Sequence, residues 1–327
     1  MMFIILCGIA FFITFSLTYF YKQWAIKRSI LDIPNERSSH LTPKPRGGGI
    51  AIIVTFYLFM FFLYLTGYID KKLFLALIPG LGLSAISFVD DFRHISPSIR
   101  LAVQFICSGS ALYFIGGFDG LFFENVRWLW FIIAVIGFVW FVNLYNFLDG
   151  SDGYASMETI SVALILWYFT GLSILLILCF IVGGFLYWNW PKAKIFMGDV
   201  GSTTIGFILI VFGIYLHNNS ELNIFFWLIV TSLFWFDATI TLLRRILKRE
   251  KLSQAHKNHM YQRVIIGGFS HLKTLLSGLG INILLFIICL AISSKIFTLM
   301  IGFILVVVIF LIIYFYIDRK FPFYTKR

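Results

Sequence analysis

The sequence predicts an all-α polytopic integral membrane protein, with about eleven transmembrane helices in a single domain that covers residues 1–327. Hydrophobic residues make up 60% of the chain and charged residues only 13%, against roughly 45–50% and about 25% in soluble globular domains. This composition excludes a soluble domain and also a disordered chain, which is poor in apolar residues. Nucleic-acid binding is not expected in spite of the net charge of +11, because a basic groove requires a water-facing fold.

The apolar runs have the length that a bilayer requires, since its hydrocarbon core is about 30 Å thick and a spanning helix takes ~20 residues. The first run has no basic segment before it and no small-residue cleavage site, so we expect a retained span rather than a removed signal peptide. Only Thr170 and Gly171 separate the sixth and seventh runs, where one long kinked segment is the alternative. In chain order, the predicted spans are 2–21, 48–67, 73–89, 99–117, 128–147, 159–172, 173–189, 203–217, 222–242, 275–294 and 296–317.

The basic residues are distributed unevenly between the two sets of connections that alternate along these spans. One set, with the tail 318–327, contains 22 of the 26 Lys and Arg residues, and the other contains only Lys71, Lys72, Arg127 and Lys295. Because cytoplasmic loops carry an excess of Lys and Arg, the first set is predicted to be cytoplasmic. We therefore expect a cytoplasmic (inner) membrane protein with its N-terminus outside, its C-terminus inside and its active site on the cytoplasmic face. The loops expected to form that site are 22–47, 90–100, 148–158, 190–202 and 243–274.

Five aspartates in the predicted cytoplasmic set lie at the ends of apolar runs. Because they come from three separate loops at one membrane level, they indicate a single site, as helix bundles build sites from facing helices. The adjacent pair points about 100° apart on a helix, so we expect one member to face a cation and the other a substrate. A solvated helix end with Arg93 as the partner is the alternative for that pair. The five residues are Asp90, Asp91, Asp149, Asp152 and Asp199.

The segment NLYNFLDGSDG carries the most specific local signal, because polar side chains recur every three residues where an apolar run ends. Asn143, Asn146, Asp149 and Asp152 therefore lie near one helix face, and the two glycines let the backbone leave the helix or approach a ligand. Polar groups at membrane depth are costly and usually functional. A polar turn between two spans is the alternative interpretation.

The segment FMGDVGSTT predicts a magnesium and phosphate site at the start of the eighth span. Gly201, Ser202 and Thr203 open the helix and leave backbone N–H groups free, which is a natural seat for an anion. Asp199 beside this seat is suited to hold Mg²⁺ that bridges phosphates. In the alternative interpretation, Ser202 or Thr203 only caps the helix.

Two basic segments are predicted to contact phosphate or sugar groups. Lys44 and Arg46 lie at the tip of a Pro- and Gly-rich loop, where phosphate capture and a plain positive-inside loop are equal alternatives. The loop 243–274 contains eight Lys and Arg residues, and no Cys or nearby carboxylate completes a zinc set there. A basic loop held to anionic lipid is the alternative for this segment. Its residues expected to contact the substrate are His256, His259 and Arg263.

One acid lies inside a predicted span and is interpreted structurally. Asp237 is found about two turns before the basic loop, and Arg244 follows seven residues later on the same helix face. A charged group within a membrane span usually has a partner. We therefore expect a structural ion pair between Asp237 and Arg244.

Taken together, VDD, the PRGGG loop, NLYNFLDGSDG and FMGDVGS resemble the polyprenyl-phosphate N-acetylhexosamine-1-phosphate transferases of glycosyltransferase family 4. The resemblance covers residues 35–275 in order. The family includes enzymes that start O-antigen and teichoic-acid glycans, and the phospho-MurNAc-pentapeptide transferase of peptidoglycan synthesis. The peptidoglycan branch has consecutive histidines in its last cytoplasmic loop, whereas His256 and His259 are separated here. The chain is therefore similar to the O-antigen and polymer-initiating branch.

The resemblance implies transfer of a sugar 1-phosphate from a UDP-linked N-acetylhexosamine to a polyprenyl phosphate, expected to be undecaprenyl phosphate. The products would be a polyprenyl-diphosphate sugar, which starts a cell-envelope glycan, and UMP. The implied cofactor is Mg²⁺, with Mn²⁺ as an alternative. The implied partners are the UDP-sugar and the membrane-borne polyprenyl phosphate, without nucleic acid, and a homodimer is compatible with this assignment.

The same resemblance implies roles for individual residues. Asp199 matches the Mg²⁺ ligand of the family, and Asp149 is expected beside it. Asp90 matches the carboxylate proposed to deprotonate the lipid phosphate, and Asp91 matches its partner. Residues that match nucleotide-site or active-site positions are Asn146, Asp149 and Asp152, with Asn189 and Phe196 near the uracil, and Asn143 is expected on the same polar stripe.

Two functions of other classes remain as alternatives. An ion-coupled membrane transporter would use intramembrane acids as a relay, and it predicts acids near the bilayer midplane together with paired repeats. A non-catalytic scaffold would bind anionic lipid through the loop 243–274, but it leaves the Asn and Asp stripe unexplained.

Overall fold

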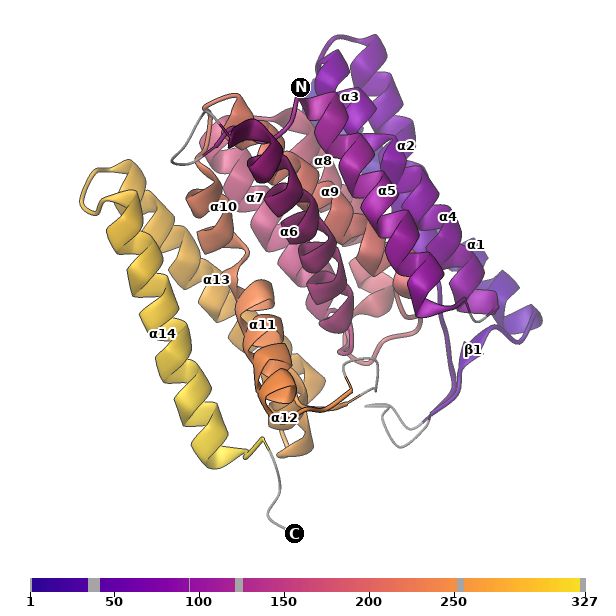
Figure 1. The fold of residues 1–327 in the computed structure, drawn as a ribbon. Helices are drawn as coiled ribbons and strands as arrows, with labels where there is room; N and C mark the ends of the chain where they lie inside the picture. The colour runs from indigo at the N-terminus through magenta and orange to yellow at the C-terminus, as the bar shows by residue number, and fades with distance from the viewer. Residues whose placement is uncertain (1, 35–41, 94, 121–125, 252–255, 324–327) are drawn as a thin grey trace.

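The protein is a bundle of helices with one short two-stranded ribbon at one end (Figure 1). The computed structural model describes residues 2–34, 42–93, 95–120, 126–251 and 256–323. In chain order, the elements are α1 (Met2–Lys27), β1 (Leu31–Asp32), β2 (Lys44–Pro45), α2 (Gly49–Leu65), α3 (Lys71–Leu77), α4 (Pro79–Phe92), α5 (Pro97–Ile115), α6 (Arg127–Phe147), α7 (Tyr154–Thr170), α8 (Ser173–Asn189), α9 (Asp199–Asn218), α10 (Ile224–Val230), α11 (Ser232–Leu247), α12 (Met260–Ile266), α13 (His271–Ser293) and α14 (Leu299–Lys320).

Helix α9 runs through the centre of the bundle. Every residue from Val200 to Leu216 is buried, as expected for a helix that is apolar all round. Helices α4 and α6 pack along α9, and the approach of α6 is close because a Cβ at Gly206 would lie 2.9 Å from the Cβ of Tyr145. Since α9 begins at Asp199, this packing also determines where the Asp199 carboxylate lies.

Helix α5 has clear start and stop signals in the sequence. The Ser96 hydroxyl accepts a hydrogen bond from the Ile99 N–H at 3.4 Å, and Pro97 occupies the first turn, where its missing N–H is not needed. Gly116 ends the helix with φ of +100°, a conformation that glycine adopts without strain. These signals fix the register of α5, on which Arg100 lies in the first turn.

The helices coincide with the predicted apolar runs, and the chain is a multi-pass membrane protein. Within the described residues, seven helices are long and apolar enough to cross a membrane, or eight if α10 and α11 form one bent span. Helices α2 and α8 are apolar but shorter, with 17 residues each. Length and composition therefore support seven or eight of the approximately eleven predicted spans.

Three details of the predicted spans differ from the structure or resolve an alternative. The third span is confirmed as one candidate span, Lys71–Phe92, in which Pro79 has no N–H and the helical hydrogen bonds break between α3 and α4. The ninth span is bent by 83° between α10 and α11, where the Thr231 hydroxyl donates to the Trp227 carbonyl at 2.9 Å. Gly171, with φ of +69°, ends α7, so residues 159–189 form two helices and the single kinked segment is wrong.

One end of the bundle, the lower end in Figure 1, holds the elements that carry the acidic and basic segments. There the antiparallel ribbon pairs Leu31 with Pro45 and Asp32 with Lys44. Helix α12, which forms inside the predicted basic loop 243–274, lies at the same end. Helix α14 also ends there. The sequence did not predict the ribbon or α12.

Candidate active site

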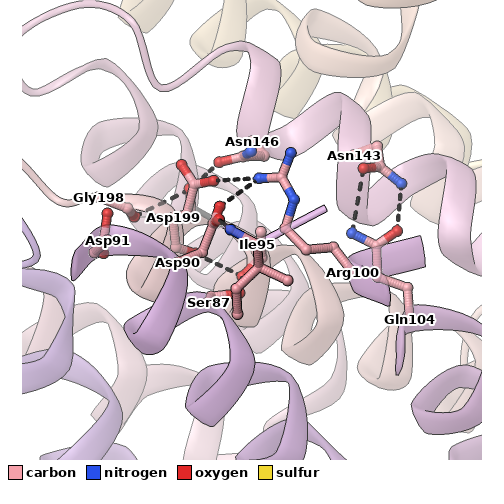
Figure 2. Close-up of polar contacts among 12 residues, drawn as sticks. Ser87, Asp90, Asp91, Ile95, Arg100, Gln104, Asn143, Asn146, Gly198 and Asp199 are labelled. Atoms are coloured by element: carbon pink, nitrogen blue, oxygen red, sulfur yellow. Dashed lines mark hydrogen bonds and ion pairs between the residues drawn. The ribbon is translucent and has the colours of Figure 1, made fainter. Parts of the chain in front are cut away.

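Carboxylates from two distant segments meet around one arginine (Figure 2). Arg100 Nη1 donates to Asp90 Oδ2 at 2.6 Å and to Asp199 Oδ2 at 3.2 Å. Asp90 Oδ1 also accepts the Ile95 N–H at 2.8 Å, which closes the turn between α4 and α5. The end of α4, the start of α5 and the start of α9 therefore converge on one positive charge.

Asp91 has different surroundings from Asp90, as their positions on a helix predict. Its side chain is buried, and Asp91 Oδ2 has no hydrogen-bond partner among the described residues. The backbone N–H groups of Asp199 and Val200 face its carboxyl, and Arg46 Nη2 donates to its backbone carbonyl. Asp91 therefore holds the first turn of α9 against the end of α4.

The PRGGG loop packs directly on the FMGDVG loop through backbone atoms of its glycines. The Gly48 N–H donates to the Phe196 carbonyl at 2.9 Å, and the Gly49 N–H donates to the Met197 carbonyl at 2.8 Å. A Cβ at Gly49 would lie only 2.3 Å from the Cα of Gly201. This approach is open to glycine alone, and it places the basic segment 44–46 beside the start of α9.

Replacing Gly49 with Ala is expected to destabilise the protein by about 1–3 kcal/mol, because the added methyl group forces the two backbones apart. Thermal unfolding in detergent micelles measures this change as a lower midpoint temperature. Gly109→Ala is the matched control, since a Cβ there meets nothing within 4 Å. Equal midpoints for both variants would contradict the close approach of these loops.

The Asn and Asp stripe contributes to the site unevenly. Asn146 Oδ1 accepts from the Ser202 hydroxyl at 2.5 Å, which ties α6 to α9. Asn143 and Gln104 exchange two hydrogen bonds, of 2.7 and 3.2 Å, which tie α6 to α5 (Figure 2). Since its amide is engaged in this way, we assign Asn143 to helix positioning rather than to substrate contact.

Asp149 lies close enough to other carboxylates for their negative charges to affect its pKa. Burial, and then the negative charges of Asp199 and Asp91, raise the pKa of Asp149 well above its usual range. The influence of Asp199 and Asp91 indicates that Asp149 lies near them, in the same group of acids.

Asp152 belongs to a separate part of the site that includes Lys44 and Phe196. Asp152 Oδ2 accepts the Ala193 N–H at 2.9 Å and lies 3.8 Å from Lys44 Nζ. The same Lys44 ammonium lies 5.1 Å from the centre of the Phe196 ring. Asn189 is buried nearby, and its amide bonds to the Gly153 N–H at 3.0 Å and the Ile195 carbonyl at 3.0 Å. Asn189 therefore holds two loops together beside Phe196.

The histidines and Arg263 of the predicted basic loop do not join Asp90 and Asp199 around Arg100. The His256 and His259 rings lie 4.9 Å apart, and His259 is buried with its ring 6.3 Å from that of Phe147. Arg263 is also buried, and its Nη1 donates to Asp318 at 2.8 Å. These contacts support packing roles for His259 and Arg263 and leave only half-buried His256 for a substrate.

The predicted ion pair between Asp237 and Arg244 is wrong. Arg244 Nη1 donates to Asp318 at 2.8 Å and to the Tyr314 hydroxyl at 2.6 Å. Both Asp237 oxygens instead accept the Met260 N–H at 2.9 Å. The helix spacing placed both residues on one face, but α14 and α12 supply nearer partners.

The stability of the protein is expected to fall as the pH drops from about 6.5 towards 4. Burial, His259 and Arg245 lower the pKa of His256 to about 4, while an unfolded histidine titrates near 6.5. The unfolded chain then binds a proton that the folded chain does not, so folding loses free energy on acidification. The slope of the unfolding midpoint against pH should decrease in His256→Gln. An unchanged slope would contradict this assignment.

Within the described residues, no group of three or more His, Cys, Asp and Glu side chains converges in a way that would hold a metal ion unaided. The structure nevertheless offers a set of carboxylate oxygens around Arg100, and Asp91 Oδ2 is buried without a partner. Carboxylate oxygens suit Mg²⁺, which keeps several water ligands and needs only one or two carboxylates. The residues therefore fit a magnesium ion that is completed by substrate and water.

Sequence analysis missed Arg100 and Gln104 as members of the site. Arg100 was counted only as one positive charge in the loop 90–100. The signal that could have found it is its position in the first turn of a capped helix that follows the Asp pair directly. Gln104 lies one turn further on the same face, where a polar residue in an apolar run is costly.

Sequence comparisons identify relatives among known proteins. The chain is 28% identical over 275 residues to a probable undecaprenyl-phosphate N-acetylglucosaminyl 1-phosphate transferase of Bacillus subtilis, with 78% of the chain and 75% of the relative covered. It is 31% identical over 201 residues to an undecaprenyl-phosphate alpha-N-acetylglucosaminyl 1-phosphate transferase of Thermotoga maritima, with 61% and 60% covered. It is 29% identical over 227 residues to a phospho-N-acetylmuramoyl-pentapeptide-transferase of Streptococcus pneumoniae, with 61% and 66% covered.

A family model matches residues 53–217, about half of the chain. This range includes Asp90 and Asp91, the Asn and Asp stripe and the start of α9. The match thus covers the elements that meet around Arg100. The chain belongs to glycosyl transferase family 4.

Proposed function

We propose that the protein transfers N-acetylglucosamine 1-phosphate from UDP-N-acetylglucosamine to undecaprenyl phosphate, forming undecaprenyl-diphosphate N-acetylglucosamine and UMP. The observation that carries the proposal is the convergence of Asp90, Asp199 and Arg100 from three helices at one end of a membrane bundle. The choice of sugar and lipid rests on the names of the Bacillus and Thermotoga relatives. The product would start a cell-envelope glycan.

In the reaction, an oxygen of the lipid phosphate attacks the sugar-bearing phosphorus of the UDP-sugar. The bond from that phosphorus to the bridging oxygen breaks, and the bridging oxygen leaves with UMP. Both reactants are anions, so the site has to offset their charges. Arg100 presents a guanidinium group suited to phosphate oxygens, and Asp90 beside it is placed to take the residual proton of a singly ionised lipid phosphate.

The proposed metal is Mg²⁺, with Mn²⁺ as an alternative, held by Asp199 and Asp149. When bound, the ion would offset the charge of the diphosphate and stabilise the negative charge of the transition state. The electrostatic interaction of Asp149 with Asp199 and Asp91 supports this placement, because it indicates that the three carboxylates lie near one another. Arg100 occupies the space between Asp90 and Asp199 in this structure, so we expect it to turn towards the substrate phosphates on loading.

The nucleotide is proposed to lie over the segment that joins Lys44, Asp152 and Phe196. Phe196 is half-buried and offers a ring for the uracil, while Lys44 above it offers a positive charge. Arg46 and His256 are the remaining candidates for phosphate or sugar contact. The direct transfer described above needs no protein nucleophile, and a phospho-aspartate intermediate on Asp90 is the alternative route.

The site is proposed to face the cytoplasm, with the N-terminus outside. The support is the distribution of basic residues, since 22 of the 26 Lys and Arg belong to connections and a tail assigned to that side. UDP-sugars are cytoplasmic, so this orientation also gives the donor access. Labelling of single cysteines in intact cells, at the 190–198 loop and at the connection between α2 and α3, would reveal the orientation.

Purified protein supplied with UDP-N-acetylglucosamine, undecaprenyl phosphate and Mg²⁺ should release UMP, and mass spectrometry should detect the lipid-linked sugar phosphate. If UMP is released only with UDP-N-acetylgalactosamine, the proposed donor sugar is wrong and the proposed type of reaction is supported. Transport into proteoliposomes without UMP formation would favour an ion-coupled transporter. Asp90 and Asp91 end α4 and Asp199 begins α9, and this position of the proposed site acids at helix ends argues against a transporter.

A further inference from the structure

Helix α12 is held by acids from two other helices. At its start, both oxygens of Asp237 on α11 accept the Met260 N–H at 2.9 Å. In its middle, Asp318 on α14 accepts from Arg263 Nη1 at 2.8 Å, and Arg263 Nη1 also donates to the Phe321 carbonyl at 2.9 Å. The short helix therefore has fixed contacts with α11 and with the C-terminal helix.

Helix α12 contacts α14 through Arg263, which shares the Asp318 carboxylate with Arg244 of α11. Asp318 Oδ1 accepts from Arg244 and from Arg263, both at 2.8 Å. Both guanidinium groups also lie over the Phe323 ring, at 4.3 and 5.4 Å from its centre. Arg263 is buried, so loss of the Asp318 charge would leave a buried cation without its counter-ion, which is strongly unfavourable.

The opposite side of α12 supports the loop that carries Asp149 and Asp152. The Tyr261 hydroxyl donates to the Phe147 carbonyl at 3.2 Å, just before this loop. The Tyr261 ring stacks on the Tyr154 ring, with centres 5.4 Å apart and planes at 22°, just after the loop. Between them, a Cβ at Gly150 would lie 2.2 Å from the Tyr261 hydroxyl. Tyr261 thus contacts both ends and the middle of the segment 147–154.

We propose that Asp318 is a positioning residue for the active site, although it lies on the C-terminal helix and contacts no other acid. By binding Arg263, Asp318 holds α12 against α14, and α12 in turn keeps Tyr261 under the segment 147–154. The carboxylates of Asp149 and Asp152 depend on this support for their positions. The effect on catalysis rests on the proposed function, whereas the mechanical link between α14 and the loop does not.

The first experiment measures turnover of Asp318→Asn, Asp318→Glu and Tyr261→Phe in the full-length protein. Asp318→Asn should lower kcat about tenfold or more, since small displacements of catalytic groups reduce rates strongly, and KM for the UDP-sugar should rise as well, because Asp152 in the displaced segment pairs with Lys44 in the proposed nucleotide site. Asp318→Glu should restore most of kcat. The double variant Asp318→Asn/Tyr261→Phe should lose no more than the larger single loss, because both act through one chain of contacts. Additive losses, or an unchanged kcat in Asp318→Asn, would overturn the proposal.

The second experiment does not depend on activity. Hydrogen–deuterium exchange of the substrate-free protein should be faster in peptides that cover 147–154 in Asp318→Asn than in the wild type. Asp70→Asn is the matched control, since Asp70 also accepts two partly buried hydrogen bonds, from the Leu73 N–H at 2.8 Å and the Tyr215 hydroxyl at 3.1 Å, but next to α3. Equal exchange in all three proteins would overturn the link, even if the wild type releases no UMP and the proposed function itself fails.

Discussion

Asp199→Asn should lower the release of UMP by about 1000-fold or more, the scale seen when a group that stabilises transition-state charge is removed. The substitution keeps the size of the side chain but removes the negative charge that would bind Mg²⁺. Asp199 is the first residue of the buried helix α9, so the packing of this helix fixes the position of its backbone. A loss of this size corresponds to about 4 kcal/mol of transition-state stabilisation.

Turnover and Mg²⁺ binding together test this expectation. Titration calorimetry should show weaker Mg²⁺ binding in Asp199→Asn, and the thermal unfolding midpoint should stay close to that of the wild type. Asp70→Asn, which alters a carboxylate at the start of α3, should keep full turnover. If Asp199→Asn and Asp149→Asn both turn over at the wild-type rate, the assignment of the active site is wrong.

Arg100→Ala is expected to lower turnover about 100-fold and, at the same time, to tighten Mg²⁺ binding in the absence of substrate. Turnover falls because a phosphate oxygen loses a charged hydrogen-bond donor. Mg²⁺ binds more tightly because Arg100 now lies between Asp90 and Asp199, at 2.6 and 3.2 Å, and competes with any other cation for those oxygens. Opposite effects on turnover and on metal affinity distinguish this role from a purely structural one.

Arg100→Lys is the control, because it keeps the positive charge but removes the planar set of guanidinium N–H donors. It should recover part of the turnover and most of the competition with Mg²⁺. If Arg100→Ala binds Mg²⁺ no more tightly than the wild type, Arg100 does not occupy the cation position. If its turnover is also unchanged, Arg100 has no role in the reaction.

The fold was largely predictable because apolar runs in a bilayer leave few alternatives to helices. Where the prediction differed, the cause was local: Pro79 interrupts one run, and a bend of 83° at Thr231 divides another. Periodicity does not register such breaks, since both halves of a broken run remain apolar. The ribbon of 31–32 with 44–45 was also missed, because its two-residue strands carry no alternating pattern.

The composition of the site was predictable where a residue is both polar and placed at the end of an apolar run, as for Asp90, Asp149 and Asp199. Pairings were much less predictable, because they depend on which helices become neighbours. Asp237 was paired with Arg244 on helix spacing, yet Arg244 reaches Asp318, which lies 74 residues further along the chain. Arg100 was overlooked for the same reason, since its second partner, Asp199, comes from a segment 99 residues away.

The central position of α9 has a consequence for how the protein responds to its membrane. Asp199 is carried by a helix that is shielded from lipid along its length, whereas Arg100 is carried by α5, whose side chains Ile99 and Ile106 are 54% and 67% exposed. We therefore expect changes in bilayer thickness or lateral pressure to act on α5 more than on α9. Activity should vary between membranes through the placement of Arg100, while the carboxylate of Asp199, the proposed metal ligand, stays in place.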